Sequence, residues 1–367
     1  MSNRLSHSQV NTFMTCGQKY KYHYIDKLRE KVTSSALLFG SAIDEALNSA
    51  LIAKREGTLT DDWTPYLAKF EEFWTNGFIN KKKESLLNNE KLVYAQADMD
   101  WDLLTDFELQ ELTTLGKGDP KDKFKAIAQQ KSEKGWLNLQ PTQRQFYNYC
   151  NWLSLRHKGK HMLEAYRVNI IPRIKQVLEV QMKLDFDNEE GDSILGYLDC
   201  VVVWEDDTIL VVDNKTSARD YELDSVRTSP QLGLYKTFMR EVYGDNIKAA
   251  FFVIKKAMAK NKKKICDTCN HDGSGSRARS CDNTINGKRC PGQWITTVDA
   301  KAEVQVIIDD IPDRVETMIV ENFDSVNKLI NTGIFTKNFN SCKGKFGLCP
   351  YYNLCWNDSK EGLDTVE

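Results

Sequence analysis

The chain has 367 residues, of which 41% are hydrophobic and 28% are charged, a composition typical of a globular protein rather than a disordered or fibrous one. Its 50 Lys and Arg residues are balanced by 52 Asp and Glu residues, and the formal net charge of -2 excludes a protein that binds nucleic acid through overall basicity. The length indicates one large domain with insertions, or two domains.

Ten cysteines are the unusual feature of this composition. No apolar run approaches the roughly 18 residues of a membrane span, and residues 1–28 lack the apolar centre of a signal peptide. We therefore expect a cytoplasmic protein that does not bind membranes, in which cysteines favour metal or cluster binding over disulfides. Cys150 and Cys200 lie alone among apolar neighbours, so we expect them to be buried core residues.

The first half of the chain is predicted to be mainly helical. Apolar spacing predicts helices over 6–28 and 36–54, with Ser6 or Ser8 as the cap of the first. Residues 60–170 are also expected to be helical, with scattered aromatic side chains as the core and no chemical motif.

The pattern changes to strands near residue 176. Residues 177–186 alternate apolar and polar side chains, which indicates a half-buried strand. Residues 194–204 and 208–216 are rich in Val, Ile and Leu and flank a short acidic turn, so they are predicted to form a hairpin.

The last third is predicted to mix helices with one more strand. Ser229 is the expected N-cap of a helix over 230–243, and 249–255 read as a strand. Residues 301–331 are expected to be helical, and the acidic tail after Trp356 is expected to be frayed. These elements predict an α/β protein with a small mixed central sheet flanked by helices.

Changes in composition divide the chain into six expected parts. A stretch rich in cysteine, glycine and lysine interrupts the α/β core and is typical of an insertion. The expected boundaries are 1–60 for N-terminal helices, 61–170 for a helical subdomain, 171–257 for the core, 258–296 for the zinc-ribbon-like insertion, 297–357 for C-terminal helices and cysteines, and 358–367 for the tail.

Two acids and a lysine are predicted to share one face of the hairpin. If the acidic turn has three residues, Trp204 pairs with Thr208. Counting back along the strands, Asp199 then lies opposite Asp213, with the Cβ atoms about 5 Å apart. Lys215 is two residues beyond Asp213 and shares its face.

Two facing carboxylates repel each other unless a divalent cation lies between them. Their hard oxygen ligands suit Mg²⁺ or Mn²⁺. A neighbouring lysine can orient or help activate a water and stabilise charge that develops on a phosphate. This combination is typical of metal-assisted phosphodiester hydrolysis. The alternative is a surface hairpin with exposed acids and a salt-bridged Lys215.

Three further side chains are candidates for the same site. Gln231 and Tyr235 are spaced i, i+4 and share a helix face just after the hairpin. Asp44, four residues after Gly40, can reach inward from an amphipathic helix as a third acid. Each also has an ordinary interpretation: Tyr235 as core, Gln231 as a capping or surface residue, and Asp44 as a solvated acid.

The order of these motifs resembles the PD-(D/E)XK nuclease superfamily, in its RecB-like branch with an iron–sulfur cluster. That branch includes the AddB nuclease domain and the CRISPR-associated adaptation exonucleases. The matching segments span nearly the whole chain but contain few residues. In chain order they are Leu5-Ser6-His7-Ser8 with Cys16, Phe39-Gly40-Ser41-Ala42-Ile43-Asp44, Gly196-Tyr197-Leu198-Asp199, Asp213-Asn214-Lys215-Thr216-Ser217, Gln231 to Tyr235, and Cys349-Pro350-Tyr351-Tyr352-Asn353-Leu354-Cys355.

The resemblance implies roles for the hairpin residues. Asp199 and Asp213 would ligate the metal, with the carbonyl of Asn214 as a further ligand. Lys215 would be the catalytic lysine.

The resemblance also extends the site to other elements. Gln231 and Tyr235 would support the site and the DNA. Asp44 stands where many relatives carry a His metal ligand, and an acid also binds Mg²⁺. Glu179 matches an acid often found on the preceding strand.

Four cysteines match the ligands of a [4Fe–4S] cluster in these relatives. They are one upstream residue, Cys16, and three residues near the C-terminus, Cys342, Cys349 and Cys355. The spacing from Cys349 to Cys355 fits the relatives, whereas the spacing from Cys342 to Cys349 is longer than usual. The alternatives are a zinc site made of the same thiolates, or free buried cysteines.

Four other cysteines lie in the insertion and suggest zinc on spacing alone. Cys266, Cys269, Cys281 and Cys290 occupy a short polar segment without a core of its own, as in a structural zinc ribbon. The CxxC is a typical zinc knuckle, the gap from Cys281 to Cys290 is less typical, and His271 is an alternative ligand.

The insertion is also basic. Residues 255–264 contain six lysines, and further Arg and Lys residues follow within the insertion. Beside a nuclease core we expect a basic protrusion that contacts the phosphate backbone. The alternative is a soluble, flexible loop.

These motifs predict a Mg²⁺- or Mn²⁺-dependent deoxyribonuclease, prokaryotic or viral, that acts on single-stranded DNA or DNA ends in recombination, repair or viral DNA processing. Recombination or replication proteins are the other expected partners. One alternative is a non-catalytic DNA-binding protein on the same fold, against which intact Asp199, Asp213 and Lys215 argue. The other is a structure-specific endonuclease such as a resolvase.

Overall fold

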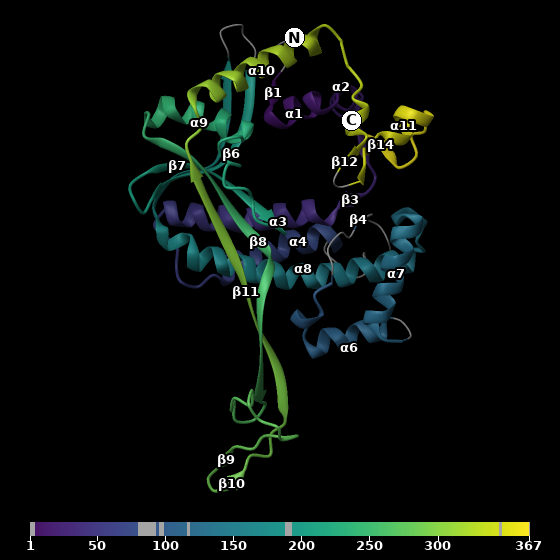
Figure 1. The fold of residues 1–367 in the computed structure, drawn as a ribbon, viewed down its shortest axis with the longest axis vertical. Helices are drawn as coiled ribbons and strands as arrows, with labels where there is room; N and C mark the ends of the chain where they lie inside the picture. The colour runs from purple at the N-terminus through teal and green to yellow at the C-terminus, as the bar shows by residue number, and fades with distance from the viewer. Residues whose placement is uncertain are drawn as a thin grey trace.

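The computed structural model describes residues 4–79, 93–94, 99–115, 118–187, 193–344 and 347–366. A mixed central sheet lies between layers of helices, as predicted for an α/β protein (Figure 1). The sheet order is β1–β6–β7–β8–β11, and β5 pairs with the other edge of β6. The strands are β1 (Leu5–Ser6), β5 (Ile174–Asp187), β6 (Ser193–Trp204), β7 (Ile209–Ser217), β8 (Ile247–Cys266) and β11 (Trp294–Asp309).

Helices cover both faces of the sheet. Two large apolar clusters form the core, one on each face. The helices α3 (Ser35–Arg55), α4 (Thr64–Ile79) and α8 (Pro141–Asn169) cover the first face, where α6 (Asp106–Thr114) and α7 (Pro120–Lys134) extend the layer beside α8 (Figure 1). The helices α1 (His7–Thr15), α9 (Pro230–Tyr243) and α10 (Asp313–Asn331) cover the second face.

Two helices follow directly from their sequence patterns. The apolar residues of α3 recur every three or four positions, and eight of its residues are buried. By length and composition α3 could cross a membrane, but this burial is that of a core helix. In α9, the hydroxyl of Ser229 accepts a hydrogen bond from the N–H of Leu232 at 3.2 Å, which confirms the predicted N-cap.

The hairpin between β6 and β7 has the predicted register. Cys200 lies opposite Val212, and the N–H of Trp204 donates to the carbonyl of Thr208 at 2.9 Å. The ladder between these strands ends at Cys200. Beyond that point β7 continues beside β8, and β6 pairs with β1 instead. The two strands of the hairpin therefore part at this end.

The two ends of the chain differ from the prediction. The helix expected over 6–28 is interrupted at Cys16, whose backbone is extended, because Gly17 packs directly against the backbone of Thr336. The tail is not frayed: β14 (Leu363–Thr365) pairs with β2 (Leu28–Glu30). Other short elements are α2 (Gly17–Tyr20), a π-helical turn (Lys21–Ile25), β3 (Thr33–Ser34), β4 (Val93–Tyr94), β12 (Lys343–Gly344), β13 (Gly347–Leu348), α11 (Tyr352–Asn357) and the 3₁₀ turns Trp101–Leu103, Trp136–Asn138, Ile171–Arg173 and Phe339–Ser341.

A long two-stranded ribbon replaces the short strand and the early part of the helix that were predicted. Residues 301–309 were expected to be helical but belong to β11, because Ala302, Val304 and Val306 alternate with polar residues and pair with β8. The helix begins only after Pro312. We call residues 258–302 the arm and its outer part, residues 263–294, the tip, which includes β9 (Thr284–Ile285) and β10 (Lys288–Arg289) (Figure 1).

Candidate functional site

Asp199 and Asp213 meet where the ladder between β6 and β7 ends. Continuing the register places these two residues opposite each other. In place of another ladder bond, the N–H of Asn214 donates to Oδ2 of Asp199 at 2.8 Å. Asp213 is 2% exposed, and Nζ of Lys215 lies 2.6 Å from its Oδ2. The predicted hairpin geometry is confirmed, because all three charged side chains gather at one point of the sheet.

The two buried carboxylates repel each other when both are ionised. Burial raises the pKa of Asp199 well above its usual range, and the neighbouring Asp213 carboxylate adds to this effect. Burial alone would lower the pKa of Lys215, but the adjacent Asp213 carboxylate outweighs it and raises this pKa. The lysine therefore stays protonated, and a divalent cation beside the acids would relieve the remaining repulsion.

Asp44 reaches this group from α3, on the first face of the sheet. Burial raises the pKa of Asp44 to about 6. Lys215 lowers this pKa, and the Asp213 carboxylate raises it. In the described residues, no three carboxylates here lie within 4.8 Å of one another. One ion in contact with Asp44, Asp199 and Asp213 therefore requires a side-chain rotation.

Gln231 and Tyr235 reach the group from α9, on the opposite face. The Nε2 of Gln231 donates to the hydroxyl of Tyr235 at 3.3 Å, so the two share a helix face as predicted. Burial raises the pKa of Tyr235, and Asp213 and Asp199 also raise it. A Cβ atom on Gly196 would lie 2.9 Å from the ring of Tyr235, which explains why glycine stands there.

The described contacts of Glu179 are with Arg55 and Tyr243 rather than with Asp199 or Asp213, so its predicted role at the site stays a prediction. It lies opposite Val201, its Oε1 accepts a hydrogen bond from the hydroxyl of Tyr243 at 3.3 Å, and Arg55 lies 3.9 Å from its Oε2. Arg55 follows Asp44 by three helical turns, about 16 Å along α3. The side chain of Glu179 therefore joins β5 to α3 and α9.

His7 is a neighbour of the site for which the sequence suggested no role. It is the first residue of α1 and follows β1, and a capping box between Ser6 and Gln9 fixes the start of this helix. Burial lowers the pKa of His7, Lys215 lowers it further, and Asp213 opposes both. His7 lies in the first of the matching segments, but its place beside the site depends on β1 pairing with β6, far along the chain.

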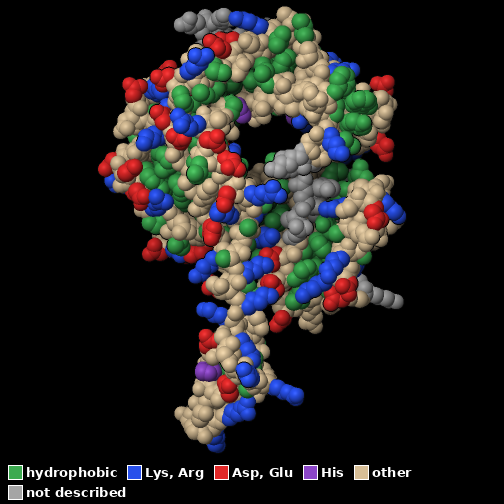
Figure 2. Space-filling view, viewed as in Figure 1, with side chains coloured by type: hydrophobic (Ala, Val, Ile, Leu, Met, Phe, Trp, Pro, Cys, Tyr) green, Lys and Arg blue, Asp and Glu red, His purple; other side chains and the backbone are tan. Residues whose placement is uncertain are grey.

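An opening passes through the molecule beside the sheet. Figure 2 shows it below the first helices, between the sheet and the C-terminal segment that carries three cysteines. Elements from both ends of the chain border this opening.

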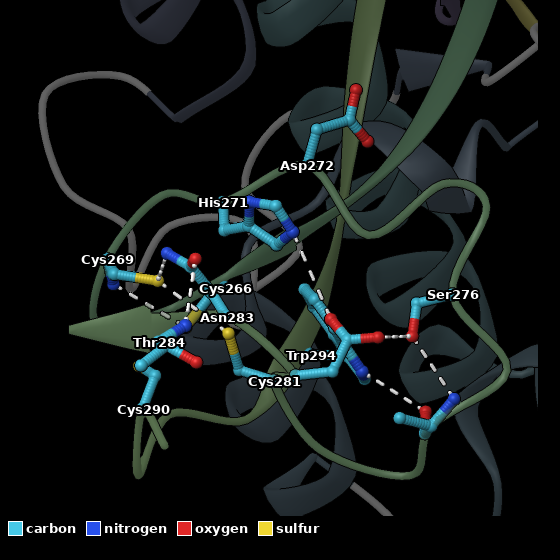
Figure 3. Close-up of polar contacts among 12 residues, drawn as sticks. Cys266, Cys269, His271, Asp272, Ser276, Cys281, Asn283, Thr284, Cys290 and Trp294 are labelled. Atoms are coloured by element: carbon cyan, nitrogen blue, oxygen red, sulfur yellow. Dashed lines mark hydrogen bonds and ion pairs between the residues drawn. The ribbon is translucent and has the colours of Figure 1, made fainter. Parts of the chain in front are cut away.

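The four cysteines of the tip form a compact set. All four sulfur atoms lie within 4.8 Å of one another, and the Cys266–Cys290 and Cys269–Cys281 pairs are both 3.6 Å apart (Figure 3). Zn–S bonds of about 2.3 Å in a tetrahedron place sulfur atoms about 3.8 Å apart. A disulfide needs an S–S distance of about 2.05 Å, and all ten cysteines are free. The tip therefore has the geometry of a four-thiolate site for a single ion.

The backbone of the tip is arranged around these sulfur atoms. The N–H groups of Thr268 and Cys269 both donate to Sγ of Cys266 at 3.4 Å, and the N–H of Gly292 donates to Sγ of Cys290 at 3.4 Å. A Cβ atom on Gly292 would clash with Sγ of Cys266. Such N–H donors stabilise thiolates and orient them toward a metal.

His271 is not part of the sulfur group. Its ring lies beside Trp294, and its Nε2 is 3.9 Å from Asp282 (Figure 3). Its backbone carbonyl accepts from the N–H of Cys266 at 2.9 Å. The alternative of a His ligand at the tip is therefore not supported.

The terminal cysteines gather more loosely. The hairpin of β12 and β13 lies between Cys342 and Cys349, and the N–H of Cys349 donates to the carbonyl of Cys342 at 2.8 Å. The N–H of Asn338 donates to Sγ of Cys16 at 3.5 Å, and Sγ of Cys342 lies 3.9 Å from the carbonyl of Asn338. The hairpin thus brings Cys342 and Cys349 together, although their spacing in the sequence is unusually long.

Cys355, the fourth candidate ligand, lies in α11. Burial raises the pKa of Tyr22 in the π-helical turn Lys21–Ile25, and Cys355 adds to this effect. No three of the four terminal sulfur atoms lie within 4.8 Å of one another in the described chain. In a [4Fe–4S] cluster each thiolate binds a different iron. The four ligand sulfur atoms therefore lie further apart than they do around a single ion.

Most lysines of residues 255–264 already have partners within the molecule, so the basic surface is smaller than the predicted protrusion. Lys255 binds Asp220 and Glu303, Lys260 binds Asp100, and Lys262 binds Asp102. Lys256 lies over the ring of Phe39, and Lys264 lies over Trp294 and donates to two carbonyls. Within the described residues of the arm, three exposed basic residues without an acidic partner, Arg277, Arg279 and Lys288, lie at the tip.

A family model described as the PD-(D/E)XK nuclease superfamily matches residues 4–113 and 108–356. These matches contain all the site residues discussed above. No curated protein matches the sequence.

Proposed function

Because the chain belongs to the PD-(D/E)XK nuclease superfamily, we propose that it is a deoxyribonuclease that hydrolyses phosphodiester bonds with Mg²⁺ or Mn²⁺. The observation that carries the proposal is the meeting of Asp199, Asp213 and Lys215 where β6 and β7 part. All three groups that metal-assisted hydrolysis needs are present, so a non-catalytic protein on this fold is the weaker alternative.

The carboxylates would hold the cation. Asp199 and Asp213, with the carbonyl of Asn214 and with Asp44 after a side-chain rotation, offer the oxygen ligands that Mg²⁺ and Mn²⁺ prefer. When bound, such an ion lowers the pKa of a bound water and neutralises charge on the phosphate.

Lys215 would act as a cation rather than as a base. The acids keep its amine protonated, so it can donate to a water or to a phosphate oxygen and stabilise the charge that develops there. Gln231 supports Tyr235 by its hydrogen bond, and Tyr235 closes the α9 side of the site.

We further propose that the substrate is single-stranded DNA or a DNA end, as in the RecB-like iron–sulfur branch of the superfamily. The opening beside the sheet supports this proposal, because a strand that passes through an opening must enter it by a free end (Figure 2). Recombination, repair or viral DNA processing would supply such substrates. A structure-specific endonuclease is the alternative.

Two metal centres are part of the same proposal. The tip would hold one Zn²⁺ on Cys266, Cys269, Cys281 and Cys290, because its sulfur spacing suits a single tetrahedral ion. The terminal group Cys16, Cys342, Cys349 and Cys355 would hold a [4Fe–4S] cluster that ties the chain ends together.

A comparison of linear and closed circular DNA tests the proposed function. We expect the protein to degrade linear single strands in Mg²⁺ or Mn²⁺ and to leave closed circles intact. Lys215→Ala should lower the rate on linear DNA by roughly a hundredfold or more, since it removes a positive charge beside the phosphate. Closed circles cut as fast as linear strands would contradict the exonuclease proposal, and full activity of Lys215→Ala would contradict the site.

Cation binding is expected to weaken in mild acid. The pKa of Asp44 is raised to about 6 by burial, and a cation binds only the ionised carboxylate. Mn²⁺ affinity should therefore fall by about tenfold or more as the pH decreases from 7 to 5, because protons then occupy Asp44 and also Asp199, whose pKa burial raises as well. Electron paramagnetic resonance of free Mn²⁺ measures this. Asp44→Asn should remove part of this pH dependence, and the same profile in wild type and Asp44→Asn would refute the role of Asp44.

A further inference from the structure

The arm continues the central sheet outward. β8 and β11 pair without interruption from Met258–Ala302 out to Cys266–Trp294, and the register shifts at the base of the arm, between Ala302 and Val304. Lys260 and Lys262 pair with Asp100 and Asp102, which lie in the helical layer. These ion pairs join the base of the arm to the body at a second point, beside the shift.

The tip carries an excess of positive charge. It contains six Lys and Arg residues and three Asp residues, a net charge of +3, in a protein whose formal net charge is -2 (Figure 2). In the part of the chain that the structure describes, Arg277, Arg279 and Lys288 are exposed and have no acidic partner. These three cations are therefore available to an external anion.

The tip holds these side chains in place. Arg277 and Arg279 flank Ala278, whose carbonyl accepts from Nε1 of Trp294 at 3.1 Å. Lys288 follows the turn between β9 and β10, at which Asn286 and Gly287 both have positive φ. An Asn-Gly pair is the usual choice for such a tight hairpin turn.

The three acids of the tip are used internally. Asp267 accepts from the N–H of Gln293 at 2.9 Å, Asp272 accepts from the N–H of Ser274 at 2.8 Å, and Asp282 accepts from the hydroxyl of Ser276 at 2.5 Å. They shape the loops of the tip, whereas the basic side chains face solvent.

The distance from the tip to the candidate active site suits duplex DNA. Lys215 pairs with Val253 of β8, and Cys266 lies thirteen residues further along this strand. At about 3.3 Å per residue, the tip is about 40 Å from the catalytic lysine. This corresponds to about twelve base pairs at 3.4 Å each. A contact so far away does not fix the direction of a flexible single strand. It does fix the direction of a duplex, because a duplex is stiff over this length.

We propose that the tip binds the phosphate backbone of duplex DNA about twelve base pairs from the point of cleavage, with Arg277, Arg279 and Lys288 as the contacts. This inference rests on the proposed nuclease function. The active site would then receive a single strand that emerges from a duplex held by the tip, and the arm would set the distance between them.

Binding to DNA with duplex parts of different length tests this proposal. We would measure fluorescence anisotropy with Lys215→Ala protein and strands that carry one fixed single-stranded overhang, of either polarity, beside 6, 12 or 24 base pairs. Affinity should rise once the duplex exceeds about twelve pairs. The triple variant Arg277→Ser, Arg279→Ser, Lys288→Ser should lose this rise, so that its affinity for the longest duplex is roughly tenfold lower. The slope of its log affinity against log salt concentration should also be smaller in magnitude by about two to three.

A matched variant removes the same charge elsewhere. Lys248, Arg314 and Lys360 are exposed and lie outside the arm and the candidate site, so their replacement by Ser should leave the length dependence unchanged. Zinc content shows whether the tip variant still folds. If the affinity of Lys215→Ala protein did not depend on duplex length, the proposal would be overturned. An equal loss of affinity by the tip variant for DNA without any duplex would also overturn it. Length-dependent binding without cleavage of any DNA would instead refute the nuclease function and leave the tip contact standing.

Discussion

Replacing Asp213 with Asn is expected to lower the rate of DNA hydrolysis by roughly a thousandfold, which corresponds to about 4 kcal/mol of transition-state stabilisation. Asp213 is 2% exposed, faces Asp199 and lies 2.6 Å from Nζ of Lys215. The neutral amide is a weaker ligand for a cation and leaves Lys215 without its closest partner. Single-turnover cleavage of a linear single strand, with Mg²⁺ in excess, measures the loss.

Thermal unfolding separates this loss of chemistry from a loss of folding. The substitution removes one of two buried charges that repel each other, so we expect the variant to fold without metal. Mg²⁺ should raise the Tm of wild type but not that of Asp213→Asn, because only wild type binds the ion tightly. Glu205→Gln changes an exposed acid in the turn of the same hairpin and should preserve both activity and the Mg²⁺ effect. Cleavage by Asp213→Asn within tenfold of wild type would exclude this residue as a metal ligand.

Two cysteine substitutions should remove two different metals. Protein purified without oxygen is expected to contain one zinc and about four irons per chain, if the tip binds zinc and the terminal cysteines bind a cluster. Cys281→Ser should lose the zinc and keep the iron, whereas Cys349→Ser should lose the iron and keep the zinc. Metal analysis with the visible absorption spectrum measures both.

The structural consequences of the two losses should also differ. The tip has almost no apolar core besides its cysteines and Trp294, so binding of the metal supplies most of its stability, about 10 kcal/mol or more. Without zinc, hydrogen exchange should increase in residues 267–293 while the sheet stays protected. Cys150→Ala serves as the control, because it alters the buried core and should keep both metals. Zinc at both sites with no iron would overturn the cluster assignment, and iron at the tip would overturn the zinc assignment.

The chemistry of the hairpin was predictable because it is local. The register of β6 and β7 follows from a three-residue turn, and it places Asp199 opposite Asp213 without any knowledge of the rest of the fold. The helical spacing of Gln231 and Tyr235 is equally local. The position of Glu179 was not predictable in this way, because its side chain is captured by Arg55 and Tyr243 from two separate helices.

The arm shows where local patterns were insufficient. Apolar residues between 301 and 309 fit a helix as well as a strand over so short a stretch, and only pairing with β8 selects the strand. The lysines of the arm read as a basic surface in sequence. Lys260 and Lys262 are neutralised by acids 160 residues away, which no sequence pattern can show.

The sequence by itself determined the types of ligand and their grouping: two acids and a lysine on one hairpin, four cysteines in an insertion, and four cysteines at the chain ends. These follow from residue identity and from spacings that a turn or a helix converts into distance. Only the tertiary structure decided that His7 adjoins the site, that a hairpin joins Cys342 to Cys349, and that Arg277, Arg279 and Lys288 lie about 40 Å away at the tip. Those facts depend on contacts between distant segments, which form through burial of shared apolar surface and ion pairing rather than through local geometry.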